Sequence, residues 1–186
     1  MSEFELPYET FIGGWFIDES ICDRLIDFFE SKSDYHFKGN ASGHEVDTDL
    51  VDDTRINLSI DDLPDDYAEA LSGCLDEYKK RYEYCDNVTY YSLQNCINIQ
   101  KYSPGGGYKV WHFEENGDDQ KRHLVFMTFL NDVPDGGTQF KYQNLTIPAI
   151  KGLTLIWPAP WTHTHRGQVS QTHTKYIITG WYNFNE

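Results

Sequence analysis

Long apolar runs are missing from this chain of 186 residues, and none approaches the roughly 20 residues that a membrane-spanning helix requires. The first ten residues, MSEFELPYET, are acidic and lack the basic and apolar stretches of a secretory signal peptide. The four cysteines form no Cys-x-x-Cys pair; they are Cys22, Cys74, Cys85 and Cys96. These absences predict a cytoplasmic protein with reduced thiols and no membrane segment.

Basic residues are also scarce, because 15 Lys and Arg stand against 30 Asp and Glu, which gives a net charge of −15. The imbalance lies in residues 1–90, which contain 23 acidic and 7 basic residues, whereas residues 91–186 contain 7 and 8. Such an acidic surface repels phosphate backbones, so we expect no nucleic-acid partner. The charge favours a basic protein or peptide as partner, and the alternative is that the acidic loops only keep the protein soluble.

The first ninety residues show helical spacing twice. Apolar residues at this spacing follow Asp18 over residues 18–32, and a second such pattern covers residues 65–84. Between them, residues 39–62 are polar and rich in Asp, which predicts a long loop with one short strand near residues 55–60.

From about residue 91 the chain changes to short β-branched or aromatic segments that are separated by turn residues: NCINIQKY, LVFMTFLND, GTQFKY, LTIPAI, GLTLIWP and KYIITGWYNF. Several strands at this spacing predict an antiparallel sandwich or barrel. Hydrophobic residues make up 39% of the chain, and we find no linker or repeat. We therefore predict a single α+β, mainly β domain over residues 1–186, with helices packed against one face of the sandwich.

One short stretch, WHFEE, suggests a metal site. His112 and Glu114 are separated by one residue, so in a strand both side chains would point to the same side and could reach one ion. A mononuclear iron(II) oxygenase needs two imidazoles and one carboxylate on one face of the metal. The second imidazole could come from His163, His165 or His173, since spacing alone does not choose among them. A zinc hydrolase and an ordinary surface strand remain alternatives at this point.

Four segments in this order, YSPGGGYKVWHFE, FLNDVPDGGTQF, IKGLTLIWP and HRGQVSQTHTKYIITGWY, resemble the catalytic domain of iron(II)/2-oxoglutarate-dependent prolyl hydroxylases. Collagen-type and hypoxia-sensing-type enzymes share this order. The resemblance runs from about residue 95 to the C-terminus, and FIDESICDRLIDFFE is similar to the N-terminal support helix of the family. It implies a double-stranded β-helix, or jelly roll, over about residues 91–186, with residues 1–90 as helical support.

The resemblance also implies roles for single residues. The iron ligands, which are the catalytic residues, fall on His112, Glu114 and His165; His165 is chosen because the family's distal His is followed by x-Gly. Lys175 matches the basic residue that pairs with the C5 carboxylate of 2-oxoglutarate, and Tyr102 matches a tyrosine that hydrogen-bonds the same cosubstrate.

Three further residues match positions at the family's substrate pocket: Tyr108, Arg122 and Trp181. Two positions depart from the family pattern, because Glu114 replaces the commoner Asp and Phe129 replaces a cosubstrate-contacting Tyr. Thr128 would point to the opposite strand face from Phe129, so it does not obviously replace that tyrosine.

The activity implied is hydroxylation of a prolyl residue in a protein or peptide, coupled to conversion of 2-oxoglutarate to succinate and CO2. It requires iron(II), 2-oxoglutarate and O2, with ascorbate as reductant, and the partner would be a peptide that is basic or contains proline. The acidic loop at residues 40–53 could close over this substrate. One alternative is the same chemistry on a free amino acid, another side chain or a small metabolite. Another is a jelly-roll binding module with a degenerate metal site.

Overall fold

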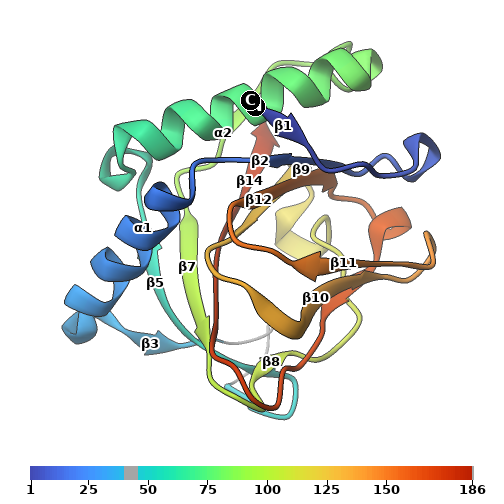
Figure 1. Cartoon of the computed structure of the whole chain (residues 1–186). Helices are drawn as coiled ribbons and strands as arrows, with labels where there is room; N and C mark the ends of the chain where they lie inside the picture. Colours follow the sequence, from blue (N-terminus) through green and yellow to red (C-terminus); the bar gives the residue numbers. More distant parts are fainter. Residues whose placement is uncertain (40–45, 186) are drawn as a thin grey trace.

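The centre of the fold is a large antiparallel sheet, seen in a computed structural model that describes residues 1–39 and 46–185 (Figure 1). In hydrogen-bonding order its strands are β1 (Ser2–Glu3), β2 (Gly13–Phe16), β12 (Leu153–Pro158), β9 (Arg122–Phe129), β14 (Lys175–Phe184), β7 (Ile97–Tyr102), β5 (Thr54–Leu58) and β3 (Phe37–Lys38). Strand β6 (Tyr91–Leu93) pairs with the far end of β14.

Two smaller sheets complete the β structure. One contains β11 (Leu145–Ala149), β10 (Val133–Phe140) and β13 (His165–Gly167), and the other pairs β4 (Val51–Asp52) with β8 (Gly107–Tyr108). Every strand pair in the described residues is antiparallel, as the predicted sandwich requires.

Both predicted helices form. In α1 (Glu19–Ser31) the carboxylate of Asp18 accepts a hydrogen bond from the backbone N–H of Ser20, which caps the first turn. Helix α2 (Asp65–Arg81) ends three residues before the predicted limit, and a 3-10 turn follows it. The short 3-10 helices are η1 (Tyr8–Thr10), η2 (Ser33–Tyr35), η3 (Ile60–Asp62), η4 (Glu83–Cys85), η5 (Gly117–Asp119) and η6 (Trp161–His163).

The two faces of the large sheet pack into different cores. Helices α1 and α2 cover one face, where Leu25, Phe29 and Leu71 are buried against Phe126 and Ile178 of the sheet. The opposite face packs against β10 and β11 in a second cluster. Strand β9 is therefore buried on both sides, which explains why every residue of LVFMTFL except Thr128 is apolar.

The first ninety residues contribute more β structure than their sequence predicts. Strand β5 agrees with the expected strand near residues 55–60, but β2 was not predicted. Strand β2 has only four residues and lies between β1 and β12. The residues of β12 that pair with it are about 140 positions away in the sequence. A short strand containing two glycines gives little local signal, so its place depends on this distant pairing.

The acidic loop predicted over residues 40–53 is described only in part, since residues 40–45 lie outside the described residues. Its last residues form β4, in which Val51 pairs with Tyr108 and Asp52 with Gly107. Closure of this loop over a substrate stays a prediction.

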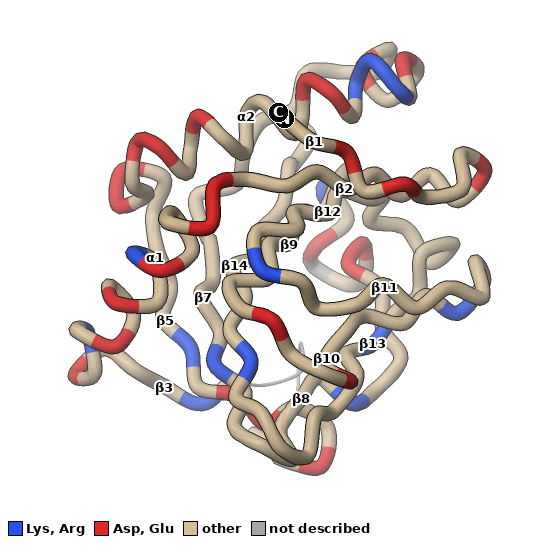
Figure 2. The backbone as a smooth tube through the Cα atoms, viewed as in Figure 1, with Lys and Arg blue, Asp and Glu red and all other residues tan. Residues whose placement is uncertain are grey.

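Acidic side chains are distributed along α1 and α2, and basic residues gather in the last turn of α2 (Figure 2). The two helices carry nine of the 23 acidic residues among residues 1–90, and the others fall elsewhere in that part of the sequence. No helix within the described ranges is long and apolar enough to cross a bilayer.

We predict that Thr128→Val lowers the free energy of unfolding by about 2–4 kcal/mol. The Thr128 hydroxyl lies between Tyr67 Oη at 3.0 Å and Thr154 Oγ1 at 2.8 Å, and all three residues are fully buried. Valine keeps the shape of threonine but leaves two buried hydroxyls without this partner. Urea denaturation measures the change, and Tyr67→Phe, which removes only one of the two bonds, should cost about 1 kcal/mol. A Thr128→Val protein as stable as wild type would contradict this account.

Candidate metal centre and cosubstrate pocket

A cavity of about 300 Å³ is lined by residues of the large sheet and of β8, β10 and β13. Alternation along the strands decides which side chains reach it. The lining residues of β14 and β7 are Lys175, Ile177, Thr179, Trp181, Asn98, Gln100 and Tyr102. The cavity therefore has both polar and apolar walls.

His112 and His165 are brought together by the backbone. The N–H of His112 donates to the carbonyl of His165 at 3.0 Å, and the reverse bond is 2.8 Å long. His112 makes only this isolated bridge, and Glu114 lies in a bend, so the predicted strand through both residues does not form. The Glu114 side chain nevertheless reaches the two imidazoles, and its backbone N–H donates to Ala159 O at 3.1 Å.

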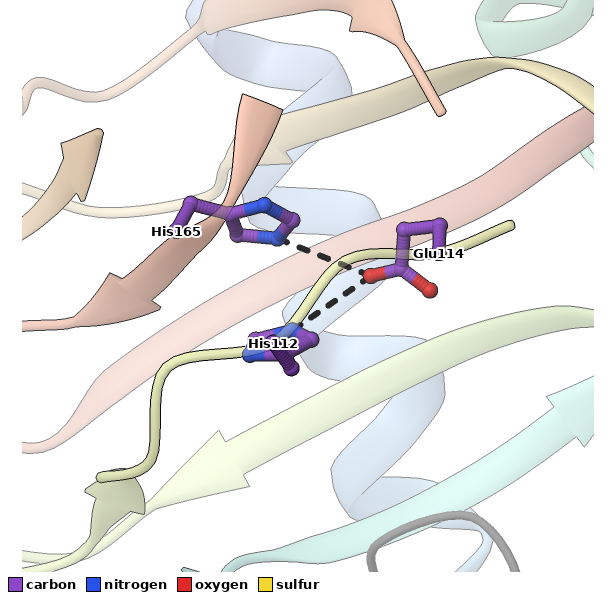
Figure 3. Close-up of side chains that lie close together, drawn as sticks. All are labelled: His112, Glu114 and His165. Carbon is purple, nitrogen blue, oxygen red and sulfur yellow. Dashed lines mark ion pairs between the residues drawn. The ribbon is translucent and has the colours of Figure 1, made fainter. Parts of the chain in front are cut away.

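The three side chains converge on one point (Figure 3). Oε1 of Glu114 lies 3.4 Å from Nε2 of His112 and 3.5 Å from Nε2 of His165. One ligand atom from each residue lies within 4.8 Å of the other two. Two imidazoles and one carboxylate that converge in this way can hold one metal ion.

Backbone carbonyls orient both imidazoles. Nδ1 of His112 lies 3.1 Å from Val110 O, and Nδ1 of His165 lies 2.8 Å from His163 O. These contacts assign the ring proton to Nδ1 and leave an Nε2 lone pair on each ring pointing to the carboxylate. Three electron-pair donors then face one another with no proton between them. A divalent cation satisfies all three, so the residues present fit a metal.

Electrostatics keep Glu114 and His165 in the protonation states that bind a metal. Burial alone would raise the pKa of Glu114, but the neighbouring His112 and His165 hold it well below its ordinary value. Burial lowers the pKa of His165, and the nearby His112 lowers it further. At neutral pH the site therefore presents a carboxylate and a neutral His165.

His163, the rival candidate for the second imidazole, is held elsewhere. Its Nε2 lies 2.9 Å from Thr10 O, and its Nδ1 lies 3.0 Å from the Thr162 hydroxyl. His173 is exposed and is not part of the cluster. The structure therefore brings His165 into the triad.

Lys175 is a buried cation, with 5% of its surface exposed. Its ammonium donates to the carbonyls of Gly136 at 2.9 Å and Gln168 at 3.2 Å, and no carboxylate of the described residues pairs with it. Burial lowers its pKa to about 8. A buried ammonium without a counter-ion, on the wall of an open cavity, is arranged to receive an anionic ligand.

Tyr102 and Phe129 both line the cavity, and Tyr102 also lies beside the ammonium of Lys175. Nζ of Lys175 is 4.9 Å from the centre of the Tyr102 ring, whose hydroxyl donates to Gln100 Oε1 at 2.9 Å. Phe129 lines the cavity, whereas Thr128 faces Tyr67 of α2 on the other side of the sheet, as the alternation predicts. The Tyr102 hydroxyl is therefore bonded to a neighbour, and its contact with a cosubstrate stays a prediction.

The three residues predicted at the substrate pocket all line the cavity. Tyr108 stacks on His112 with ring centres 3.7 Å apart. Arg122 and Trp181 instead make hydrogen bonds to the carboxylate of Glu114, at 3.2 and 3.0 Å. Their contact with a substrate stays a prediction, since the Trp181 N–H and one N–H group of Arg122 already donate to Glu114.

Polar residues of β5 and β7 that the sequence did not single out also line the cavity: Arg55, Asn57, Asn98 and Gln100. Arg55 pairs with Asp53 at 2.8 Å; burial raises the pKa of that carboxyl, and Arg55 opposes the rise. The alternation in NCINIQKY places positions 98, 100 and 102 on one face of a strand. It therefore indicates that Asn98 and Gln100 lie on the same side as Tyr102. The strand β5 was expected from the sequence, but its place beside the cavity depends on its pairing with β7, which had no local signal.

Residues 97–183 match the 2OG-Fe(II) oxygenase superfamily. They include all three residues of the His-X-Glu…His triad. A comparison with curated proteins gave no match.

Several solved structures share the fold. A viral collagen prolyl hydroxylase from Paramecium bursaria Chlorella virus-1, in complex with 2OG, is 16% identical with a TM-score of 0.70, over 94% of this chain and 97% of that chain. A Trichoplax adhaerens prolyl hydroxylase, in complex with a peptide fragment of the hypoxia inducible factor oxygen degradation domain, is 16% identical with a TM-score of 0.69 (92% and 83%). A Pseudomonas putida prolyl-4-hydroxylase is 13% identical with a TM-score of 0.67 (94% and 93%). These matches confirm the predicted double-stranded β-helix.

We predict that Lys175→Met raises the free energy of unfolding of the ligand-free protein at pH 7 by about 1–3 kcal/mol. Because the pKa of about 8 in the folded chain is below that of an exposed lysine, the cost of burying the ammonium is fully present below pH 8. This cost is relieved as the pH rises from about 8 to about 10.4, so the advantage of the variant should shrink over that range. Urea denaturation at pH 7 and pH 9.5 tests both statements. A variant less stable than wild type at pH 7 would show that the two carbonyl hydrogen bonds outweigh the cost of burial.

Proposed function

We propose that this chain, whose residues 97–183 match the 2OG-Fe(II) oxygenase superfamily, hydroxylates a prolyl residue in a protein or peptide while converting 2-oxoglutarate to succinate and CO2. One observation carries the proposal: a His-Glu-His triad and a buried, unpaired ammonium line the same cavity. Iron(II), when bound, would supply the activation of O2. The residues of the chain would bind and orient the reactants and exclude water.

In this proposal His112, Glu114 and His165 hold the metal, and Lys175 receives the C5 carboxylate of 2-oxoglutarate. The Tyr102 ring next to Lys175 would form one wall of the cosubstrate pocket. Lysine acts here as a point charge, so the two carbonyls that already bind it would keep it in place while one proton donates to the carboxylate.

The charges of the cavity support a peptide over a free amino acid. Three cationic side chains line it, and two already have carboxylate partners: Arg55 pairs with Asp53, and Arg122 with Glu114. Lys175 is the third, and it would pair with the C5 carboxylate of 2-oxoglutarate. A free amino acid would bring a second carboxylate for which no unpaired cation of the described lining is left, whereas an internal peptide residue brings none.

The uncharged part of the cavity fits the same substrate class. The carboxamides of Asn57 and Asn98 could hydrogen-bond peptide groups, and the rings of Tyr108 and Trp181 beside the triad could pack on a pyrrolidine ring. The three solved structures described above are prolyl hydroxylases, and one of them is in complex with a peptide. The excess of acidic residues over residues 1–90 favours a basic peptide.

Oxygenase chemistry on another side chain or on a small metabolite is the alternative within the same family. All three residues of the triad are present and Lys175 lines the same cavity, which argues against a binding module with a degenerate metal site.

Succinate production tests the proposal. We expect protein prepared without oxygen and supplied with iron(II), ascorbate, 2-oxoglutarate and then O2 to form succinate faster with proline-containing basic peptides than with matched peptides in which alanine replaces proline. Mass spectrometry should locate one added oxygen on proline. His112→Ala should abolish turnover. Equal stimulation by both peptide sets would favour another target residue, and the absence of any 2-oxoglutarate binding would overturn the oxygenase itself.

We also predict that 2-oxoglutarate binding to the manganese(II)-loaded protein weakens by about tenfold per pH unit above pH 8. The reason is that the ammonium of Lys175, with a pKa of about 8, must be charged to pair with a carboxylate. Calorimetric titrations at pH 7, 8 and 9 measure the effect. Lys175→Arg is the control, because arginine stays protonated and should give a nearly constant affinity over this range. An equally constant affinity in the wild type would exclude Lys175 as the anion partner.

A further inference from the structure

We infer that Arg122 and Trp181 are positioning residues that hold one oxygen of Glu114 away from the metal, so that this carboxylate offers only its other oxygen to the ion. The inference rests on the metal site of the proposed function. It gives these two residues a task that is separate from any contact with substrate.

The two oxygens of Glu114 have different surroundings. Oε1 faces Nε2 of both histidines, at 3.4 and 3.5 Å. Oε2 accepts hydrogen bonds from the guanidinium of Arg122 at 3.2 Å and from the indole N–H of Trp181 at 3.0 Å. With two donors in place, the electron pairs of Oε2 are directed away from the site where the imidazoles converge.

Arg122 is itself fixed from several sides. Its guanidinium lies over the Trp181 ring at 3.8 Å, donates to the backbone carbonyl of Glu114 at 3.2 Å and pairs with Asp119 at 3.1 Å. Only 10% of its side-chain surface is exposed. A planar cation held in this way cannot follow the carboxylate if Glu114 moves, so it defines where Oε2 stays.

The chain needs such a device because of the residue type at position 114. Glutamate has one more rotatable bond than aspartate, so its carboxylate can turn further and can present both oxygens to an ion. Glu114 also lies in a bend outside any strand. Arg122 at the start of β9 and Trp181 in the neighbouring strand β14 supply from the rigid sheet what the local backbone does not. A one-oxygen ligand leaves more positions of the metal open for other ligands.

Electrostatics and positioning predict opposite effects when Arg122 is removed. A positive charge next to a carboxylate ligand competes with the metal, so its loss alone should strengthen metal binding. If Arg122 orients the ligand, its loss should weaken metal binding, as the loss of groups that orient metal ligands usually does. Trp181 carries no charge, so replacing it tests positioning without this complication.

Manganese(II) affinity of the oxygen-free protein, measured by electron paramagnetic resonance of the free ion, is the readout. We expect Trp181→Phe, which keeps a ring for Arg122 but removes the N–H donor, to bind manganese(II) about tenfold more weakly than wild type. Arg122→Met should also bind it more weakly, and Arg122→Lys, which keeps the charge and one possible donor, should lose less.

The chain offers a matched control pair. Arg166 lies over the Trp111 ring at 4.4 Å, and these residues adjoin His165 and His112 in sequence, yet no hydrogen bond to Glu114 involves them. Arg166→Met and Trp111→Phe should leave manganese(II) affinity within about twofold of wild type. Unfolding midpoints of the metal-free proteins separate misfolding from positioning, and Trp181→Phe alone is sufficient if Arg122→Met does not fold.

The outcomes separate the inference from the function on which it rests. Wild-type protein that binds manganese(II), together with Trp181→Phe and Arg122→Met proteins that bind it equally well or more tightly, would overturn the positioning role and leave the metal site intact. Wild-type protein that does not bind manganese(II) would overturn the metal site and the inference together. An equal loss in the control pair would also contradict the inference.

Discussion

Two backbone hydrogen bonds between His112 and His165 are the constraint on which the site depends. They join the segment after β8 to β13, which belongs to the small sheet, and so place two imidazoles side by side. Carbonyls of the same two segments orient the rings through Nδ1. The metal-facing nitrogens are therefore positioned by main-chain geometry, which costs little further side-chain ordering once the jelly roll has formed.

The charges around the cavity are arranged so that one cation has no partner. Glu114 forms an ion pair with Arg122, and Asp53 forms one with Arg55. Lys175 is buried and forms no ion pair with a carboxylate of the described residues. A buried ammonium held only by carbonyls destabilises the empty protein relative to an apolar residue, and an anionic ligand removes that penalty. Under the proposed function, the desolvation of Lys175 both lowers the stability of the empty protein and favours 2-oxoglutarate binding.

Glutamate at position 114 changes what the surrounding residues must do. A shorter carboxylate would be limited by its own backbone, whereas the longer one depends on Arg122 and Trp181 for its orientation. Residues that the family resemblance assigned to the substrate pocket therefore contact a metal ligand, and they lie on the inner face of the large sheet.

Local patterns in the sequence determined the two helices, the alternation that places Thr128 and Phe129 on opposite faces, and most strands after residue 91, because spacing and propensity act within a few residues. Resemblance to a known family added the triad and Lys175. Only the tertiary structure decided which strands β2 and β5 pair with, that the rival His163 is held by Thr10, and that Arg122 and Trp181 contact the carboxylate of Glu114. Each of these depends on pairing between segments that are distant in the sequence, and such pairing is decided by the packing of the whole chain and not by any local pattern.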